Sequence, residues 1–344
     1  MGLGARNPHA PRSSGEPREE IAAQSGGGGT GRAAPDILVV GEALIDIVGH
    51  ADGSEERVPG GSPANVALGL GRLGIRTAFL SHLARDVDGA SIQRRLAGSG
   101  VDVLPASFSA ERTPTALVEL DGDGHASYSF AVTWELPPAT EIVLPGALHV
   151  GSYSAFLVPG AEQVLALASG ARAAGKLVTL DPNIRPALIG DPEHVRARFE
   201  ELAGLADVVK LSDEDASWLY PGDTIEETLD RILGLGAQLA ATTRGRAGAV
   251  LATRAGRAEV SAPETRAIDT IGAGDSFMAA LIAAVLPVDD APGKAGPLRA
   301  LGSTELAEIG GLCAAAAALT VSRRGADLPT RSELAALRID QTPS

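Results

Sequence analysis

The chain has 344 residues, of which 44% are hydrophobic and 21% charged, and this ordinary globular composition excludes a wholly disordered protein. Its net charge of −14 at pH 7 opposes binding to a nucleic-acid backbone or to an anionic membrane surface, so we expect neither as a partner. The one cysteine, Cys313, excludes an intrachain disulfide, and no apolar stretch approaches the ~20 residues of a membrane span. We therefore expect a cytoplasmic protein.

The first segment of the chain differs from the rest. Residues 1–34 contain Pro11, Pro17 and the glycine run Gly26–Gly29, without the apolar core of a signal peptide. We expect a disordered N-terminal tail over residues 1–34 and a single folded domain over residues 35–340.

From Asp36 onward, short apolar runs alternate with longer segments rich in alanine and leucine. The predicted strands are Ile37–Val40, Arg76–Ser81, Leu148–Gly151, Leu177–Leu180, Val208–Leu211 and Leu239–Thr243. The predicted helices are Pro63–Leu73, Gly160–Ala174, Pro192–Leu205, Ile225–Leu233, Ser276–Leu286 and Glu305–Ser322. Such alternation predicts an α/β fold with a largely parallel sheet covered on both faces.

One segment interrupts this alternation. Two short strands at Thr115–Leu120 and Ala126–Phe130 flank the turn residues Asp121–Gly124, which predicts a hairpin. We expect a small β lid, from about residues 47–59 and 105–134, inserted into the α/β domain.

Two glycine patterns resemble nucleotide-binding loops but stand in the wrong context. Gly69, Gly71 and Gly74 have the spacing of a dinucleotide motif, yet they lie late in a predicted helix. Gly170 and Gly175 precede a strand, whereas a phosphate-binding loop follows one. We interpret Gly74 and Gly175 as helix stops.

The segment Asp269–Asp275 predicts phosphate chemistry. Its small residues let successive amides turn toward one point at the start of a helix, where unpaired donors and the helix dipole favour an anion. Asp275 at the end of this loop has two interpretations, a catalytic carboxylate or a plain first-turn capping residue.

The run DTIGAGD at Asp269–Asp275, followed by SFMAAL, resembles the C-terminal signature of the ribokinase (PfkB) family. GGSPAN at Gly60–Asn65 resembles the family's N-terminal signature, and the likeness extends over Pro35–Pro329. The resemblance implies a ribokinase-like three-layer α/β/α fold with a β lid and an ATP-dependent sugar kinase.

The resemblance also implies a role for each matching position. The catalytic group comprises Asp275 as the base and Gly272, Ala273 and Gly274 as the amides that stabilise the γ-phosphoryl group. The sugar-binding group comprises Asp46, Gly60, Gly61, Asn65, Asn183 and Arg185. The ATP-binding group comprises Thr243, Gly245 and Lys210, together with Gly272 and Gly274. From the residues alone, the less favoured alternatives are a turn residue for Asp46 and for Gly245, and a helix cap for Asn65.

Two metal sites follow from the same resemblance. Ser212 and Asp215 occupy the positions at which the family orders water on Mg²⁺, although the residue types differ and a solvated helix start explains them almost as well. Asp269, Ile271 and Gly325 mark the expected site of a monovalent cation such as K⁺.

The residues that follow Gly60 and Gly61 narrow the range of possible sugar substrates. Ser62 and Pro63 replace the lysine typical of ribokinases and phosphosugar kinases, and the stretches GEALID and DPNIR resemble fructokinases most. The alternatives are a 2-keto-3-deoxygluconate kinase, with Arg185 bound to the acid, a ribokinase-type sugar or nucleoside kinase, and a non-catalytic sugar-sensing regulator. The expected partners are a sugar and ATP, with a homodimer through the β lid as an open question.

Overall fold

The computed structural model describes residues 34–49, 54–120, 126–287 and 298–340. Apart from Ala34, the tail predicted over residues 1–34 lies outside the described residues, as does the turn predicted at Asp121–Gly124.

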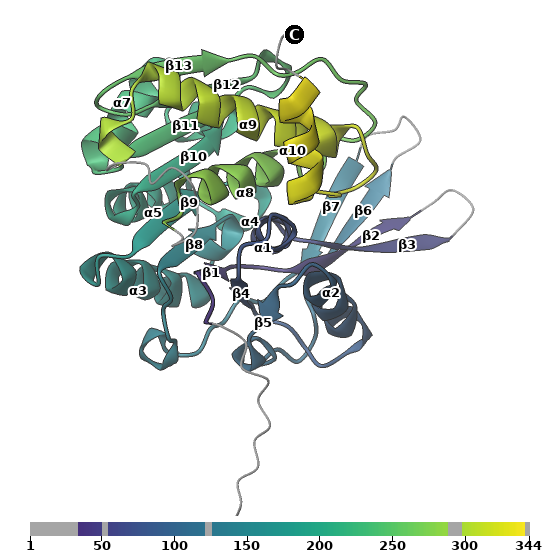
Figure 1. The fold of residues 1–344 in the computed structure, drawn as a ribbon. Helices are drawn as coiled ribbons and strands as arrows, with labels where there is room; N and C mark the ends of the chain where they lie inside the picture. Colours follow the sequence, from purple (N-terminus) through teal and green to yellow (C-terminus); the bar gives the residue numbers. More distant parts are fainter. Residues whose placement is uncertain (1–33, 50–53, 121–125, 288–297, 341–344) are drawn as a thin grey trace, which may run out of the picture. The chain divides into compact units, whose positions relative to one another are not determined.

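A nine-stranded sheet forms the centre of the domain, in the order β13-β12-β11-β10-β9-β8-β1-β4-β5 (Figure 1). Its strands are β1 (Ile37–Val40), β4 (Thr77–Leu80), β5 (Asp102–Val103), β8 (Ala147–Gly151), β9 (Leu177–Asp181), β10 (Val208–Ser212), β11 (Leu239–Thr243), β12 (Ala249–Ala252) and β13 (Arg257–Val260). All neighbours pair in parallel except β11 with β12 and β12 with β13. The six predicted strands are present, whereas the antiparallel edge formed by β12 and β13 was not predicted.

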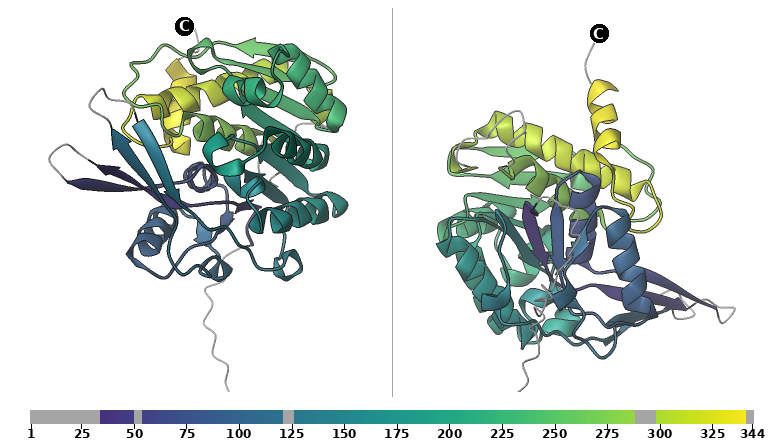
Figure 2. Two further views of the ribbon diagram at one scale, coloured as in Figure 1. Left: turned by 180° about the vertical axis from the view of Figure 1, so that it is seen from behind. Right: turned by 60° about the horizontal axis from the view of Figure 1, so that its bottom comes forward.

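Helices cover both faces of this sheet, which confirms the predicted three-layer α/β/α arrangement (Figures 1 and 2). One layer contains α1 (Ser62–Arg72), α2 (Val87–Gly98), α8 (Ala273–Val285), α9 (Ser303–Val321) and α10 (Arg331–Asp340). The other contains α3 (Gly160–Ala173), α5 (Pro192–Leu205), α6 (Asp213–Leu219) and α7 (Ile225–Leu235). Each layer buries its own apolar cluster against the sheet, so the central strands are apolar on both sides.

The glycine patterns behave as helix stops. Gly69 and Gly71 lie within α1, and Gly74 follows that helix with φ 82°. Gly175 follows α3 with φ 66°. Both φ values are left-handed, a conformation that glycine adopts without the steric cost of a Cβ atom.

A separate four-stranded sheet has the order β3-β2-β6-β7 and contains β2 (Leu44–Gly49), β3 (Glu55–Gly60), β6 (Thr115–Leu120) and β7 (Ala126–Ala131). It projects from the β1 and β4 side of the domain (Figure 1). The strands β6 and β7 pair antiparallel, as the hairpin pattern predicts. Asp46 lies inside β2 and not in the turn after β1, because the small sheet begins at Leu44, three residues before the predicted start of the lid.

Contrary to the expectation from the sequence, one described helix, α9, is long and apolar enough to cross a membrane, judged by length and composition. It packs on α8 and on the strands β12 and β13, and its residue Cys313 is fully buried. The helix covers the antiparallel edge of the large sheet, so its apolar composition has an explanation within the fold.

Candidate active site

The N-terminus of α8 forms one wall of the site. Gly272 is the N-cap with a left-handed φ of 79°, and a Cβ atom there would lie 2.7 Å from the Cβ of Ala326. This turn starts the helix at Ala273, three residues earlier than predicted. The Ala273 amide donates to Thr270 O at 3.3 Å, and the following amides of the first turn point along the helix axis, where they can bind an anion.

Asp275 lies in this first turn and is only 9% exposed. Its Oδ1 accepts a hydrogen bond from Ser62 Oγ at 2.7 Å, and its Oδ2 accepts one from Asn65 Nδ2 at 2.8 Å. Burial raises the pKa of Asp275, and the two hydrogen bonds oppose this rise. The carboxylate therefore reaches across to α1 and does not cap its own helix, while its catalytic role stays a prediction.

Lys210 lies beneath the same turn. Its Nζ is 2.9 Å from Asp181 Oδ2, and both side chains are buried. A Cβ atom on Gly274 would lie 3.0 Å from the same Nζ, so the ammonium group is close to the backbone of the α8 N-terminus. Burial lowers the pKa of Lys210, but the carboxylates of Asp181, Asp215 and Asp275 outweigh it and raise the pKa, so the amine stays charged.

Four of the predicted sugar residues belong to the small sheet and the start of α1: Asp46, Gly60, Gly61 and Asn65. A Cβ atom on Gly60 would lie 2.2 Å from Asp46 Oδ2, so the Asp46 carboxylate lies directly against the backbone of Gly60. Gly61 has φ 104° and begins α1 as its N-cap. Burial raises the pKa of Asp46 to about 6, while the positive charge of Arg185 lowers it. The positive charge of Arg185 also lowers the pKa of Asp275, against the larger effect of burial.

Two groups near the sugar residues, Glu42 and Tyr153, were not predicted as site residues. Glu42 is buried, its Oε2 accepts from the Ser154 amide at 3.4 Å, and burial raises its pKa to about 7. The Tyr153 hydroxyl is buried and has no hydrogen-bond partner among the described residues. Burial and then the charges of Glu42 and Asp46 raise the pKa of Tyr153. The GEALID stretch contains Glu42, but nothing local in sequence indicates that Tyr153 lies beside it.

The remaining predicted residues lie at the carboxyl edge of the large sheet. Asn183 follows β9 with an unusual φ of 36°, and its Nδ2 is 3.5 Å from Ser152 Oγ. Thr243 ends β11 and is paired in register with Ser212 of β10. Gly245, in the following 3₁₀ turn with φ 50°, faces open space, so a nucleotide can approach the backbone there.

The residues predicted for Mg²⁺ have structural partners. Ser212 is the N-cap of α6, where its Oγ accepts from the Asp215 amide at 3.0 Å and its own amide donates to Asp215 Oδ2 at 2.9 Å. Asp215 Oδ1 accepts from the Ile184 amide at 2.7 Å. No cluster of three or more His, Cys, Asp or Glu side chains suited to a metal occurs in the described part of the chain. Both residues thus stabilise the start of α6, and the water-mediated contact with Mg²⁺ stays a prediction.

The three residues predicted for a monovalent cation lie together. Asp269 Oδ1 accepts from the Ile271 amide at 3.0 Å, and Asp269 Oδ2 accepts from the Gly325 amide at 2.9 Å. A carboxylate has about four acceptor positions, so these oxygens keep capacity for a cation. The contacts join the loop before α8 to the segment after α9.

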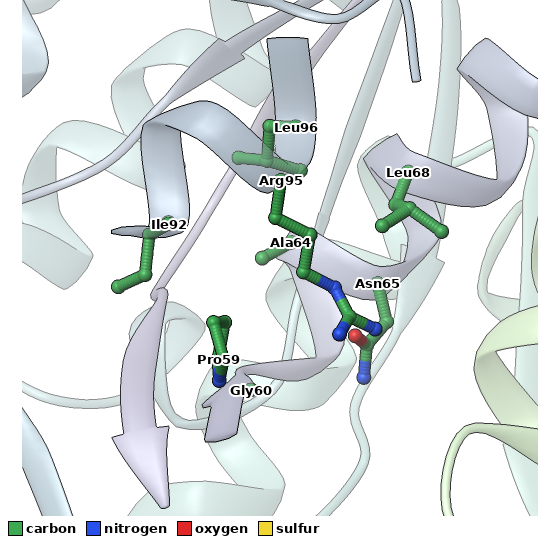
Figure 3. Close-up of a pocket in the computed structure, with 8 residues that line it drawn as sticks. All are labelled: Pro59, Gly60, Ala64, Asn65, Leu68, Ile92, Arg95 and Leu96. Atoms are coloured by element: carbon green, nitrogen blue, oxygen red, sulfur yellow. The ribbon is translucent and has the colours of Figure 1, made fainter. Parts of the chain in front are cut away.

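A small pocket lies behind Asn65, between the end of β3 and the helices α1 and α2. Its lining consists of Pro59, Gly60, Ala64, Asn65, Leu68, Ile92, Arg95 and Leu96. Figure 3 shows these residues, with the guanidinium group of Arg95 directed toward Asn65. The cavity measures about 10 Å³, which is near the minimum for one water molecule and too small for a sugar. This cavity is therefore not the site predicted for the sugar.

Comparison with known proteins agrees with this geometry. The model of the pfkB family carbohydrate kinases matches residues 34–333, which is most of the chain. The chain belongs to this family. The fructokinase of Klebsiella pneumoniae is 34% identical over 259 residues, which cover 72% of this chain and 83% of that enzyme.

Solved structures of the family have the same fold. Fructokinase from Xylella fastidiosa with bound ATP superposes with a TM-score of 0.78 at 27% identity and covers 89% of this chain and 99% of its own. A double mutant of fructokinase from Vibrio cholerae O395, with fructose, ADP and a potassium ion bound, gives a TM-score of 0.74 at 28% identity with the same two coverages. The described domain is thus a pfkB carbohydrate kinase.

Proposed function

We propose that this pfkB kinase is a fructokinase, which transfers the γ-phosphoryl group of ATP to a hydroxyl group of D-fructose. The main support for this proposal is that the two signature segments contact each other. Ser62 and Asn65 of the first segment donate hydrogen bonds to the Asp275 carboxylate of the second, at the N-terminus of α8. A proton acceptor for the sugar and a set of amides for a phosphate are thereby fixed beside each other.

The proposed reaction uses these groups in one step. The sugar hydroxyl oxygen bonds to the γ-phosphorus as the bond from that phosphorus to the bridging oxygen of ADP breaks, and the hydroxyl proton passes to Asp275. Each oxygen of Asp275 already accepts one hydrogen bond, but a carboxylate has about four acceptor positions, so a hydroxyl can still be bound. A raised pKa makes Asp275 a better acceptor than an ordinary aspartate.

The reaction also requires that the negative charge on the transferred phosphoryl group be stabilised, because this transition state is loose and spreads charge over the equatorial oxygens. The first amides of α8 and the Lys210 ammonium group beneath Gly274 supply fixed positive potential there. Mg²⁺ bound with ATP would further neutralise the charge of the phosphates. Asp46, Asn65, Asn183 and Arg185 would orient the sugar, and Thr243 and Gly245 would border the nucleotide.

Fructose is favoured over other sugars by the named fructokinase relatives and by the Ser62 and Pro63 pair. The test is an ADP-release assay with fructose, ribose, 2-keto-3-deoxygluconate, fructose 6-phosphate and adenosine. We expect the highest kcat/KM for fructose. A clear preference for the sugar acid would assign Arg185 to its carboxylate and reject the proposal. If none of the five compounds stimulates ADP release, the result would favour the alternative of a non-catalytic sugar-sensing regulator.

A further inference from the structure

A second cavity lies at the edge of the large sheet opposite to the active site. It measures about 270 Å³ and is lined by Arg172, Gly236, Ala237, Gln238, Arg254 and Arg299. Arg172 lies near the end of α3, Gln238 directly precedes β11, and Arg254 follows β12. The cavity is therefore at the edge where the parallel strands begin, whereas the active site lies where they end. Five residues of β11, at about 3.3 Å each, separate the two edges by roughly 15 Å.

Three arginines around one cavity are unusual in a chain with a net charge of −14. Arg172 is partly neutralised, because its Nη1 donates to Asp207 Oδ1 at 2.6 Å. Gln238 Nε2 donates to the same oxygen at 2.7 Å, and the Val178 amide occupies Asp207 Oδ2. Asp207 thus holds Arg172 and Gln238 in place and has its own acceptors engaged.

The other two arginines keep their charge available. Neither Arg254 nor Arg299 forms an ion pair with a carboxylate of the described residues, and both are exposed. The last carbonyls of α7 bring partial negative charge to this region. Arg254 Nη2 donates to one of them, Leu233 O, at 3.4 Å, so most of its five N–H donors remain for a ligand.

We propose that this arginine cavity binds a small phosphate-bearing metabolite with at least two negative charges, at a site separate from the active site. The volume lies just below the usual range for ligand pockets, which suits a molecule smaller than a nucleotide. Guanidinium groups bind phosphate oxygens in bidentate pairs, and the arginines converge from three separate segments of the chain. The site does not depend on which sugar the enzyme phosphorylates.

The test uses inorganic pyrophosphate as the probe and isothermal titration of the full-length protein. In Arg254→Gln with Arg299→Gln, we expect affinity to fall by about tenfold for each arginine removed, because each replacement deletes charge-assisted hydrogen bonds. Arg172 is left unchanged, since its loss would leave the buried Asp207 carboxylate without its partner. Fructose-dependent kcat and KM in this variant should stay at the wild-type values.

Two matched variants make the result decisive. Gly274→Asp places a carboxylate against Lys210 and should block phosphate binding at the active site, yet leave pyrophosphate binding in the arginine cavity. Arg94→Gln removes an exposed arginine of α2 and should have no effect. The proposal is overturned if wild type does not bind pyrophosphate, if Gly274→Asp abolishes the binding, or if Arg94→Gln weakens it as much as the double variant does.

Discussion

Replacing Asp275 by asparagine separates its chemical role from its structural one. The asparagine oxygen can accept from Asn65 Nδ2, and its amide nitrogen can donate to Ser62 Oγ, because a hydroxyl group can act as donor or acceptor. Both hydrogen bonds to α1 thus survive the substitution, whereas the charge and the proton acceptor are lost.

The expected loss of activity is large. A positioned general base contributes about 10² to 10⁴ in rate, so kcat should fall by that factor, or about 2.7 to 5.5 kcal/mol in activation free energy. Binding of ATP and of fructose should persist, because the residues assigned to both ligands are unchanged.

The stability of the Asp275→Asn variant should not fall with its activity. The pKa of Asp275 is raised by folding, so its ionised form costs stability once the pH exceeds that pKa, and the cost is absent below its ordinary value. At pH 7 the asparagine variant escapes this cost, and we expect its Tm to equal or exceed that of the wild type by a few degrees.

Steady-state ADP release, calorimetric titration of both ligands and thermal denaturation measure the three quantities on one preparation. Asp102→Asn, on the exposed residue of β5, provides the control and should leave all three unchanged. A kcat within tenfold of wild type would refute the base assignment. A drop in Tm together with lost ligand binding would show that Asp275 mainly holds α8 to α1.

Two further predictions concern the surrounding residues. The pKa of Asp46 is about 6, so its carboxylate becomes protonated as the pH falls below 6, and we expect the KM for fructose to rise there. Asp46→Asn should remove this pH dependence of KM. A variant that keeps the wild-type pH profile would contradict the role of Asp46. Gly272→Ala should lower stability by about 1 to 3 kcal/mol in denaturant unfolding, because of its left-handed φ and the contact with Ala326. Gly175→Ala has a similar φ but open space around it, so an equal loss there would show that the contact is unimportant.

Much of the large sheet could be predicted because its central strands are short apolar runs between helical segments. The strands β12 and β13 are harder to recognise, since Ala249–Ala252 follows β11 after only a short turn and β13 consists of four residues of mixed polarity. The small sheet was placed approximately from its hairpin, but its strand β2 pairs in parallel with β6 some seventy residues later, a contact that no local pattern indicates.

In the candidate site, too, some features have a local sequence signature and others depend on contacts between distant residues. Asp275 and the glycines before it could be identified because a glycine turn at a helix start has a local signature. The hydrogen bond from Ser62 joins residues 213 positions apart, and the ion pair of Lys210 with Asp181 joins neighbouring strands through their register. Such contacts depend on the tertiary fold, so the sequence alone did not indicate that the Asp215 carboxylate accepts hydrogen bonds from the Ile184 and Ser212 amides. The arginine cavity is the extreme case, because its three arginines lie on segments that only the sheet order brings together.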